Sequence, residues 1–317
     1  MKSKTKKILL SIVLILLSYG FIIYKIASFK ELRNINFTNQ HYSSFDFLIL
    51  LIAIVLMILN WSIETVKWKI LVDKIQHFSF FKALQAVFSG ITIGIFTPNR
   101  VGEIGGRVVF IEKGKRTFGV LATGIGSFAQ FITTIITGIM GFVLFLIFYP
   151  ERITNNPIFN NITVYGLIIF LIILIWIYFN IKRIKNLLLK IRFFKSKVDQ
   201  LEYLSETKFI TLFKLILLSF ARYFIFITQI FLLLFFFKVH LTISQAYISI
   251  SLIYLFATLI PTTTLIELGV RGSLAIFFIG LFSKNLLGIV LSASLLWIIN
   301  IAIPSIIGSL FFIKNKL

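Results

Sequence analysis

Two segments of the sequence combine a proline with the pattern Glu-x-Gly-x-Arg five or six residues later. They are PNRVGEIGGR, residues 98–107, and PTTTLIELGVR, residues 261–271. Arginine offers forked donors that suit phosphate. A helix that starts at a proline leaves free N–H groups and a partial positive charge in its first turn, where anions bind. The two segments therefore predict a site for an anionic phosphate group.

The acidic residues of these segments predict a second role. Glu103 and Arg107 are four residues apart, in the order that favours an ion pair within a helix. The carboxylates could neutralise the arginines when no ligand is present, or meet a cationic headgroup or a proton. The predicted substrate-binding residues are Pro98, Asn99, Arg100, Glu103, Arg107, Pro261, Glu267 and Arg271.

Structural roles also explain parts of this pattern. Thr264 with Glu267 fits a capping box, in which the glutamate only closes the start of a helix. Arg107 could serve only as the ion-pair partner of Glu103, holding its segment together. Charged residues at membrane depth are nonetheless functional candidates, so both interpretations stay open.

Four further residues carry weaker indications. Arg222 could snorkel or pair, and it is a weaker site candidate than the arginines above. Glu64 lies near one end of an apolar run and is interpreted as an interface anchor beside two tryptophans. Gly90 and Gly94 form a GxxxG pattern, which is typical of close helix packing in membranes.

The elements that hold the two segments are strongly apolar. Of 317 residues, 58% are hydrophobic and 14% are charged, whereas a soluble domain carries about a quarter charged residues. Several uncharged runs exceed the roughly 18 residues that cross a bilayer. The sequence therefore predicts an all-α integral membrane protein with about six full spans. These spans are residues 8–24, 45–66, 117–149, 162–181, 209–237 and 285–313.

Composition also excludes several classes of chemistry. The net charge of +21 is explained by lysines and arginines in cytoplasmic loops, as in other membrane proteins, so no nucleic acid partner is predicted. The absence of cysteine removes disulfides and thiolate chemistry. His41, His77 and His240 are too widely spaced to indicate a metal site. No catalytic residue, metal or cofactor is predicted.

Loop charge predicts the orientation of the spans. Basic clusters at the N-terminus, at 67–82, at 113–116 and at 182–208 place these regions in the cytoplasm. The stretch 83–112 then enters and leaves on the cytoplasmic face. Because the C-terminal lysines also belong inside, the stretch 241–282 begins and ends outside. Both stretches are therefore predicted to be re-entrant hairpins of broken helices, entering from opposite faces.

The hairpins suggest an internal duplication. The unit 45–149 contains a span, a hairpin and a span, and the unit 209–313 repeats this order upside down. Inverted repeats with broken helices that meet near the midplane are typical of transporters. We therefore expect one membrane domain, 1–317, in which the segments 98–107 and 261–271 approach each other and line a shared cavity.

The pattern P-x-R-x-G-E-x-x-x-R, formed by Pro98, Arg100, Gly102, Glu103 and Arg107, resembles the lysylphosphatidylglycerol synthase transmembrane domain family, also called flippase-like membrane proteins. The tryptophan that follows a basic residue at 67–68 and the stretch IPTTTLIELG are similar too. The resemblance covers nearly the whole chain. It implies an integral membrane domain that handles lipids and, in some members, translocates an aminoacylated phospholipid.

Two departures from the family pattern bear on the substrate. Many relatives carry a Glu-Arg pair in the span after the motif, where this chain has Ser127 and Gln130, so part of the polar site and its lipid could differ. Bifunctional relatives add a soluble aminoacyl transferase domain. This sequence ends at Leu317, directly after the last predicted span, so a membrane domain alone is expected.

The predicted function is translocation of a lipid across the inner cell membrane without ATP and without enzymatic activity, with both termini cytoplasmic. The expected partners are membrane lipids, namely an anionic or aminoacylated phospholipid or a polyprenyl-linked lipid. The alternative is a non-transporting accessory subunit for a separate glycosyl- or aminoacyl-transferase. An enzyme acting on polyprenyl-phosphate lipids is disfavoured because the sequence offers no pairing of a base with a nucleophile.

Overall fold

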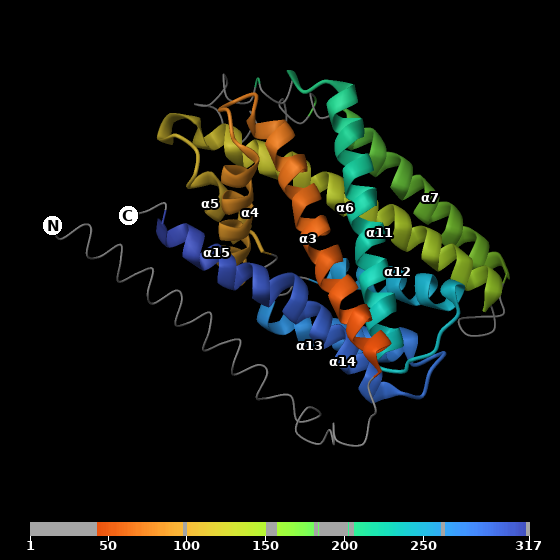
Figure 1. Ribbon diagram of the computed structural model, residues 1–317. Coiled ribbons are helices and arrows are strands. Elements are labelled where there is room, and N and C mark those ends of the chain that lie inside the picture. Colours follow the sequence, from red (N-terminus) through yellow and green to blue (C-terminus); the bar gives the residue numbers. More distant parts are fainter. Residues whose placement is uncertain are drawn as a thin grey trace.

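The computed structural model describes residues 43–97, 100–149, 157–180, 206–260 and 264–314, together with residues 183 and 202. Throughout these residues the regular structure is helical, which confirms the predicted all-α membrane fold. Figure 1 shows long helices that run side by side, with shorter helices between them. The elements are α3 (Ser44–Val72), α4 (Phe80–Gly94), α5 (Gly102–Val108), η2 (Lys113–Lys115), α6 (Arg116–Phe148), α7 (Pro157–Phe179), α11 (Phe209–Phe236), α12 (Ile243–Leu259), α13 (Thr264–Ile279), α14 (Leu286–Trp297), the π-helical turn η4 (Ile298–Ala302) and α15 (Ile303–Lys314).

Five helical stretches are long and apolar enough to cross a bilayer. They are Ser44–Val72, Lys113–Phe148, Ile162–Phe179, Phe209–Phe236 and Leu286–Phe312. Each corresponds to one of the predicted spans, and the remaining predicted span, 8–24, lies outside the described residues. The first hairpin stretch contains α4 and α5, and the second contains α12 and α13. All four of these helices are shorter than the spans.

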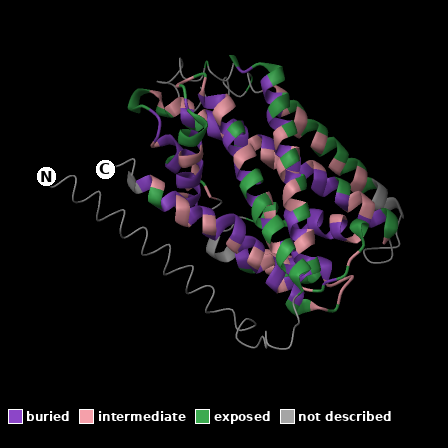
Figure 2. Ribbon diagram, in the orientation of Figure 1, coloured by how far each residue is buried: buried purple, intermediate pink, exposed green. Residues whose placement is uncertain are grey.

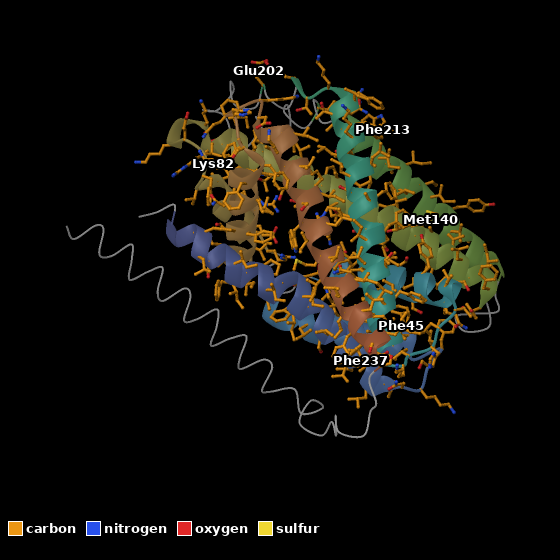
Figure 3. All side chains as sticks on the ribbon, in the orientation of Figure 1. Phe45, Lys82, Met140, Glu202, Phe213 and Phe237 are labelled. Atoms are coloured by element: carbon orange, nitrogen blue, oxygen red, sulfur yellow. The ribbon has the colours of Figure 1, made fainter. Side chains whose placement is uncertain are left out.

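The outer faces of the long helices are apolar, as a lipid environment requires. In Figure 2 the exposed residues follow the outside of the bundle, and α7 is exposed along most of its length. Phe45, Met140 and Phe213 are exposed apolar side chains on these outer faces (Figure 3). Because lipid tails are as apolar as these side chains, the helices do not associate through the hydrophobic effect alone, and close packing of small residues becomes important.

Glycines bring α4 and α5 together. A Cβ atom added to Gly106 would lie 2.6 Å from the Cα atom of Gly90, and one added to Gly94 would lie 2.6 Å from the Cγ atom of Glu103. The backbone of α5 therefore rests directly on α4. This contact confirms that Gly90 and Gly94 serve helix packing.

Each hairpin stretch begins and ends at the same end of the bundle. At one end, the backbone N–H of Glu112, which follows α5, donates to Oε1 of Gln76, which precedes α4, at 3.1 Å. At the other end, Nδ2 of Asn285, which follows α13, donates to the backbone oxygen of Phe237, which precedes α12, at 3.0 Å. This geometry supports the re-entrant interpretation, which stays a prediction because no membrane is part of the structure.

The packing pattern is consistent with two repeats. Exchanging the two predicted units pairs α3 with α11, α4 with α12, α5 with α13, and α6 with the stretch α14–α15. The contact of α4 with α15 then becomes the contact of α12 with α6, and both are extensive. The same exchange turns the contact of α4 with α5 into the contact of α12 with α13, and it leaves the contact of α3 with α11 unchanged. The duplication stays a prediction, which this pairing supports.

One assumption behind the loop charges is wrong. The sequence predicts Lys67 and Lys69 in the cytoplasmic region 67–82, but α3 continues to Val72 and includes both. Lys67 is 1% exposed and contacts buried polar groups. It therefore says nothing about the orientation of the loop, which now depends on the remaining basic residues.

Cysteine labelling tests the orientation. The chain has no native cysteine, so single cysteines at Gln76 and at Lys284 can each be probed with an impermeant maleimide on intact cells. We expect labelling at position 284 and none at position 76 until the membrane is opened. Labelling of position 76 from outside would reverse the assigned orientation.

Candidate functional site

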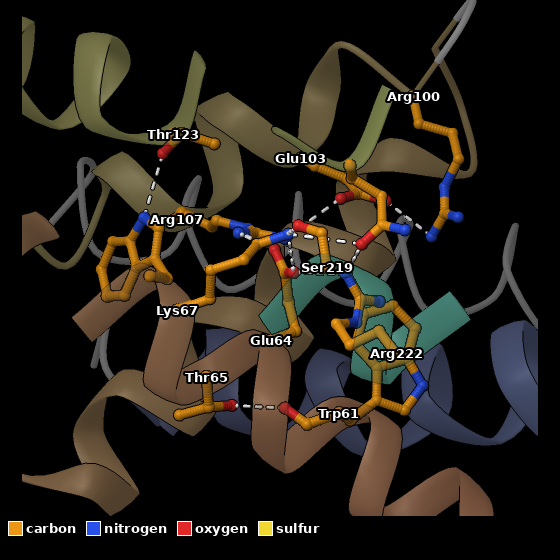
Figure 4. A network of polar contacts seen from close by, with 12 residues as sticks. Trp61, Glu64, Thr65, Lys67, Arg100, Glu103, Arg107, Thr123, Ser219 and Arg222 are labelled. Atoms are coloured by element: carbon orange, nitrogen blue, oxygen red, sulfur yellow. Dashed lines mark hydrogen bonds and ion pairs between the residues drawn. The ribbon is translucent and has the colours of Figure 1, made fainter. Parts of the chain in front are cut away.

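The centre of the polar site is Glu64, on the inner face of α3. Its Oε1 atom accepts a hydrogen bond from Nη1 of Arg107 at 2.8 Å, and its Oε2 atom lies 3.0 Å from Nζ of Lys67 and also accepts from Nη1 of Arg222. Glu64 is 5% exposed, and Lys67 and Arg107 are also buried. Three helices thus direct cations at one buried carboxylate (Figure 4).

The network continues from Arg107 to two other charged residues of the predicted segment 98–107. Nη2 of Arg107 donates to Oε2 of Glu103 at 3.2 Å, and Oε1 of Glu103 lies 2.6 Å from Nη2 of Arg100. The predicted Glu103–Arg107 pair therefore forms, and each partner also binds a second group. Arg100 adopts a φ of 57°, a left-handed conformation that is uncommon for a residue other than glycine.

Neutral side chains of α3, α6 and α11 complete the network. Oε1 of Gln130 accepts from Nη1 of Arg222 at 3.2 Å and from Nζ of Lys67 at 3.4 Å. Nε of Arg222 donates to Oδ1 of Asn60 at 2.8 Å, and Nζ of Lys67 donates to the hydroxyl of Ser219 at 3.2 Å. These contacts orient the cations but add no negative charge.

The network carries an excess of positive charge. With Lys67 protonated, it contains four cations, Arg100, Arg107, Arg222 and Lys67, against two carboxylates, Glu64 and Glu103. The described part of this network therefore carries two more positive charges than negative charges. Buried charge that is not balanced costs several kcal/mol, so this site is suited to an anionic ligand.

A second ion pair lies on α13. Glu267 and Arg271 bind each other one helical turn apart. The guanidinium carbon of Arg271 lies 5.2 Å from the ring centroid of Tyr254 on α12, within the range of a cation–π interaction. The Glu267–Arg271 pair is neutral, so the excess charge remains that of the network around Glu64.

A cavity of about 190 Å³ lies between these groups. Arg100 lines it from the first predicted hairpin stretch, Arg271 from the second, and Arg222 from α11. Asp and Glu are both missing from the described residues that line it. The lining consists of Asn60, Trp61, Arg100, Gln130, Thr134, Arg222, Tyr223, Phe226, Ile230, Ile253, Tyr254, Leu268, Arg271, Ala275, Ala293, Leu296, Trp297, Asn300 and Ile301.

Four of the lining residues hold a buried polar atom that lacks a hydrogen-bond partner. The atoms are Nε of Arg100, Nε of Arg271, Nε1 of Trp297 and Oδ1 of Asn300. Buried polar atoms in folded proteins are almost always paired. Their grouping around one cavity provides hydrogen-bonding atoms for a polar group of a ligand.

The structure places the predicted site residues in two layers. Arg100 and Arg271 line the cavity, so the two predicted segments do approach one space. Glu103, Arg107 and Glu267 lie behind them as ion-pair partners and do not line it. Contact with substrate stays a prediction for all of these residues. Pro98, Asn99 and Pro261 lie outside the described residues.

The start of α5 differs from the predicted helix that begins at a proline. The helix α5 has only seven residues, starts at Gly102 and carries Glu103 in its first turn. A helix this short offers a weak dipole, and the glutamate already satisfies its positive end. The arginine side chains, rather than the start of α5, therefore supply the positive charge of the site.

The structure gives Glu64, Arg222 and Gln130 larger roles than the sequence predicts. Glu64 is the acceptor for three cations rather than the predicted interface anchor. Arg222, a weaker candidate by sequence than the other arginines, joins the network to the cavity. The sequence does contain a general signal for Glu64 and Arg222, because an ionisable residue within an apolar span is a functional candidate by default.

Comparison with known proteins identifies the family of the chain. No curated protein and no solved structure matches the chain. The model of the lysylphosphatidylglycerol synthase transmembrane region matches residues 7–308, which include every element of the site. This membership and the apolar helices indicate a multi-pass membrane protein of lipid metabolism or transport. The chain belongs to the lysylphosphatidylglycerol synthase transmembrane region family.

Proposed function

We propose that this protein translocates a lipid across the inner cell membrane by admitting its headgroup to the arginine-lined cavity, without ATP and without chemical change to the lipid. The observation that carries the proposal is the cavity itself. It is lined by residues of both predicted hairpin stretches, it receives arginines from three parts of the chain, and its wall holds unpartnered polar atoms.

The arrangement of the hairpins supports a path through the membrane. The stretches that contain α4–α5 and α12–α13 return to opposite ends of the bundle, and both supply an arginine to one cavity. In transporters with inverted repeats, the substrate site lies at such a meeting point, and rocking of one repeat against the other opens it alternately to each side. We extend this mechanism to residues 45–149 and 209–313.

A lipid headgroup needs compensation for the water that it loses in the bilayer. Arginine donors can replace that hydration with charge-assisted hydrogen bonds. The acyl chains can remain in lipid, because the outer helix faces are apolar. In this mechanism the protein lowers the barrier for the headgroup, and the lipid gradient or the membrane potential sets the direction.

The proposal is tested with purified protein in liposomes that contain a trace of fluorescent phosphatidic acid. A membrane-impermeant quencher added outside destroys the outer-leaflet signal at once and the inner-leaflet signal only as lipid crosses. We expect the protein to accelerate the second phase in the absence of any nucleotide, compared with protein-free liposomes.

The same assay separates the proposal from the accessory role. A transferase subunit without transport activity would leave the second phase at the protein-free rate for every lipid supplied. That result, obtained with protein that is folded by its melting curve, would contradict the translocase proposal.

A further inference from the structure

We propose that the cavity selects a lipid whose headgroup ends in a phosphomonoester, a group with close to two negative charges, over phosphodiester and aminoacylated phospholipids. This inference rests on the proposed function and names its substrate class. It is carried by the charge balance of the network, by the donors that remain unpartnered, and by the cavity's aromatic and apolar lining.

The charge balance of the site determines which net charge of a headgroup it can neutralise. The network around Glu64 holds two cations more than carboxylates, and the Glu267–Arg271 pair is neutral. A phosphomonoester carries about −1.5 to −2 at pH 7, whereas a phosphodiester carries −1. Only the monoester matches the excess. An aminoacylated phospholipid carries at least one cationic amine beside its phosphodiester, so its net charge is zero or positive and does not reduce the excess.

The unpartnered donors match a terminal phosphate. Nε of Arg100, Nε of Arg271 and Nε1 of Trp297 lack acceptors, and a phosphomonoester presents three non-bridging oxygens, one more than a diester does. Each of these residues lines the cavity. A phosphate therefore supplies acceptors for donors that the described residues leave without one.

Much of the rest of the lining is apolar. It suits the carbon atoms that join the phosphate to the lipid, rather than a sugar or a nucleotide. Phe226, Leu268 and Leu296 are apolar and share the cavity with the arginines. A small terminal phosphate can reach the arginines while its glycerol or prenyl carbon contacts these side chains. The volume of about 190 Å³ leaves room for a phosphate and the first carbons of its lipid.

Two lipids that differ by one methyl group test the charge argument. Dioleoylphosphatidate and dioleoylphosphatidylmethanol have the same chains, but only the first is a monoester. Both are titrated into phosphatidylcholine nanodiscs that contain the full chain, with tryptophan fluorescence as the readout, because Trp61 and Trp297 line the cavity. We expect phosphatidate to change the fluorescence at about one-tenth of the mole fraction at which phosphatidylmethanol produces the same change.

A single substitution changes the charge of the site with little change in shape. Oε1 of Gln130 already accepts hydrogen bonds from Arg222 and Lys67, so Gln130→Glu keeps these contacts and removes one of the two excess charges. The preference for phosphatidate should then fall below about threefold. Gln245→Glu is the matched control, since this residue closes the capping box of α12 and glutamate serves that position equally well.

The outcomes separate the inference from the proposed function. Equal action of the two lipids on the unaltered chain, or an unchanged preference in Gln130→Glu, would overturn the selection for phosphomonoesters, even if the protein still translocates lipids. Inorganic phosphate is expected to displace phosphatidate only at far higher concentration. Equal potency of inorganic phosphate would overturn the assignment to a lipid. The fluorescence titration measures binding and does not require transport. The preference for phosphatidate can therefore be measured even if the protein translocates no lipid.

Discussion

Replacing Glu64 with glutamine is expected to lower the free energy of unfolding by about 3–5 kcal/mol, the usual effect of removing one partner from a buried ion pair. Glu64 is the acceptor for Lys67, Arg107 and Arg222. Without its charge, the network would hold four cations against the single carboxylate of Glu103. The loss is measured as a lower melting temperature of the purified protein in detergent.

The control for this prediction is Glu112→Gln. Glu112 pairs with Lys115 at 2.8 Å, but its side chain is 60% exposed, and exposed pairs contribute about 0–1 kcal/mol. The melting temperature of this variant should stay close to that of the unaltered chain. Equal effects of the two substitutions would show that Glu64 is not the centre of a buried network.

Gly105 and Gly106 are adjacent in α5, yet alanine at the two positions should have opposite effects. A Cβ atom on Gly106 would lie 2.6 Å from the Cα atom of Gly90 and from the backbone oxygen of Ser89. Backbone atoms cannot yield without moving α5, so we expect Gly106→Ala to destabilise the protein by about 1–3 kcal/mol and to displace Arg107 from Glu64.

Gly105 provides the internal control. A Cβ atom there meets nothing within 4 Å, and alanine favours a helix over glycine by about 0.5–1 kcal/mol. Gly105→Ala should therefore be neutral or stabilising in the same melting measurement. A destabilisation of similar size in both variants would contradict the described packing of α5 on α4.

The sequence predicted the spans because hydrophobic runs and flanking charges suffice for them. The helices α3, α6, α7, α11 and α14–α15 all fall where a strongly apolar run is long enough to cross a bilayer. The pairing of Glu103 with Arg107 was likewise accessible, since it depends on spacing within one helical turn. These features are local, and local patterns can be recognised in one sequence.

The centre of the site was not accessible in this way. Glu64 and Arg222 are separated by 158 positions along the chain, and only the packing of α3 against α11 brings them together. The same holds for Gln130, whose neutral amide leaves the charge excess uncompensated. Nothing in the local sequence of 127–130 indicates that this amide lies beside two cations.

The most direct test of the account is the rate of lipid translocation when the cavity is filled. Ala293 lines the cavity, so Ala293→Phe places a ring where the headgroup is proposed to pass. Ala221 is exposed on α11, and Ala221→Phe is the matched control. In the quenching assay with fluorescent phosphatidic acid, the account predicts the protein-free rate for Ala293→Phe and the unaltered rate for Ala221→Phe. Full activity of folded Ala293→Phe would contradict passage of the headgroup through this cavity.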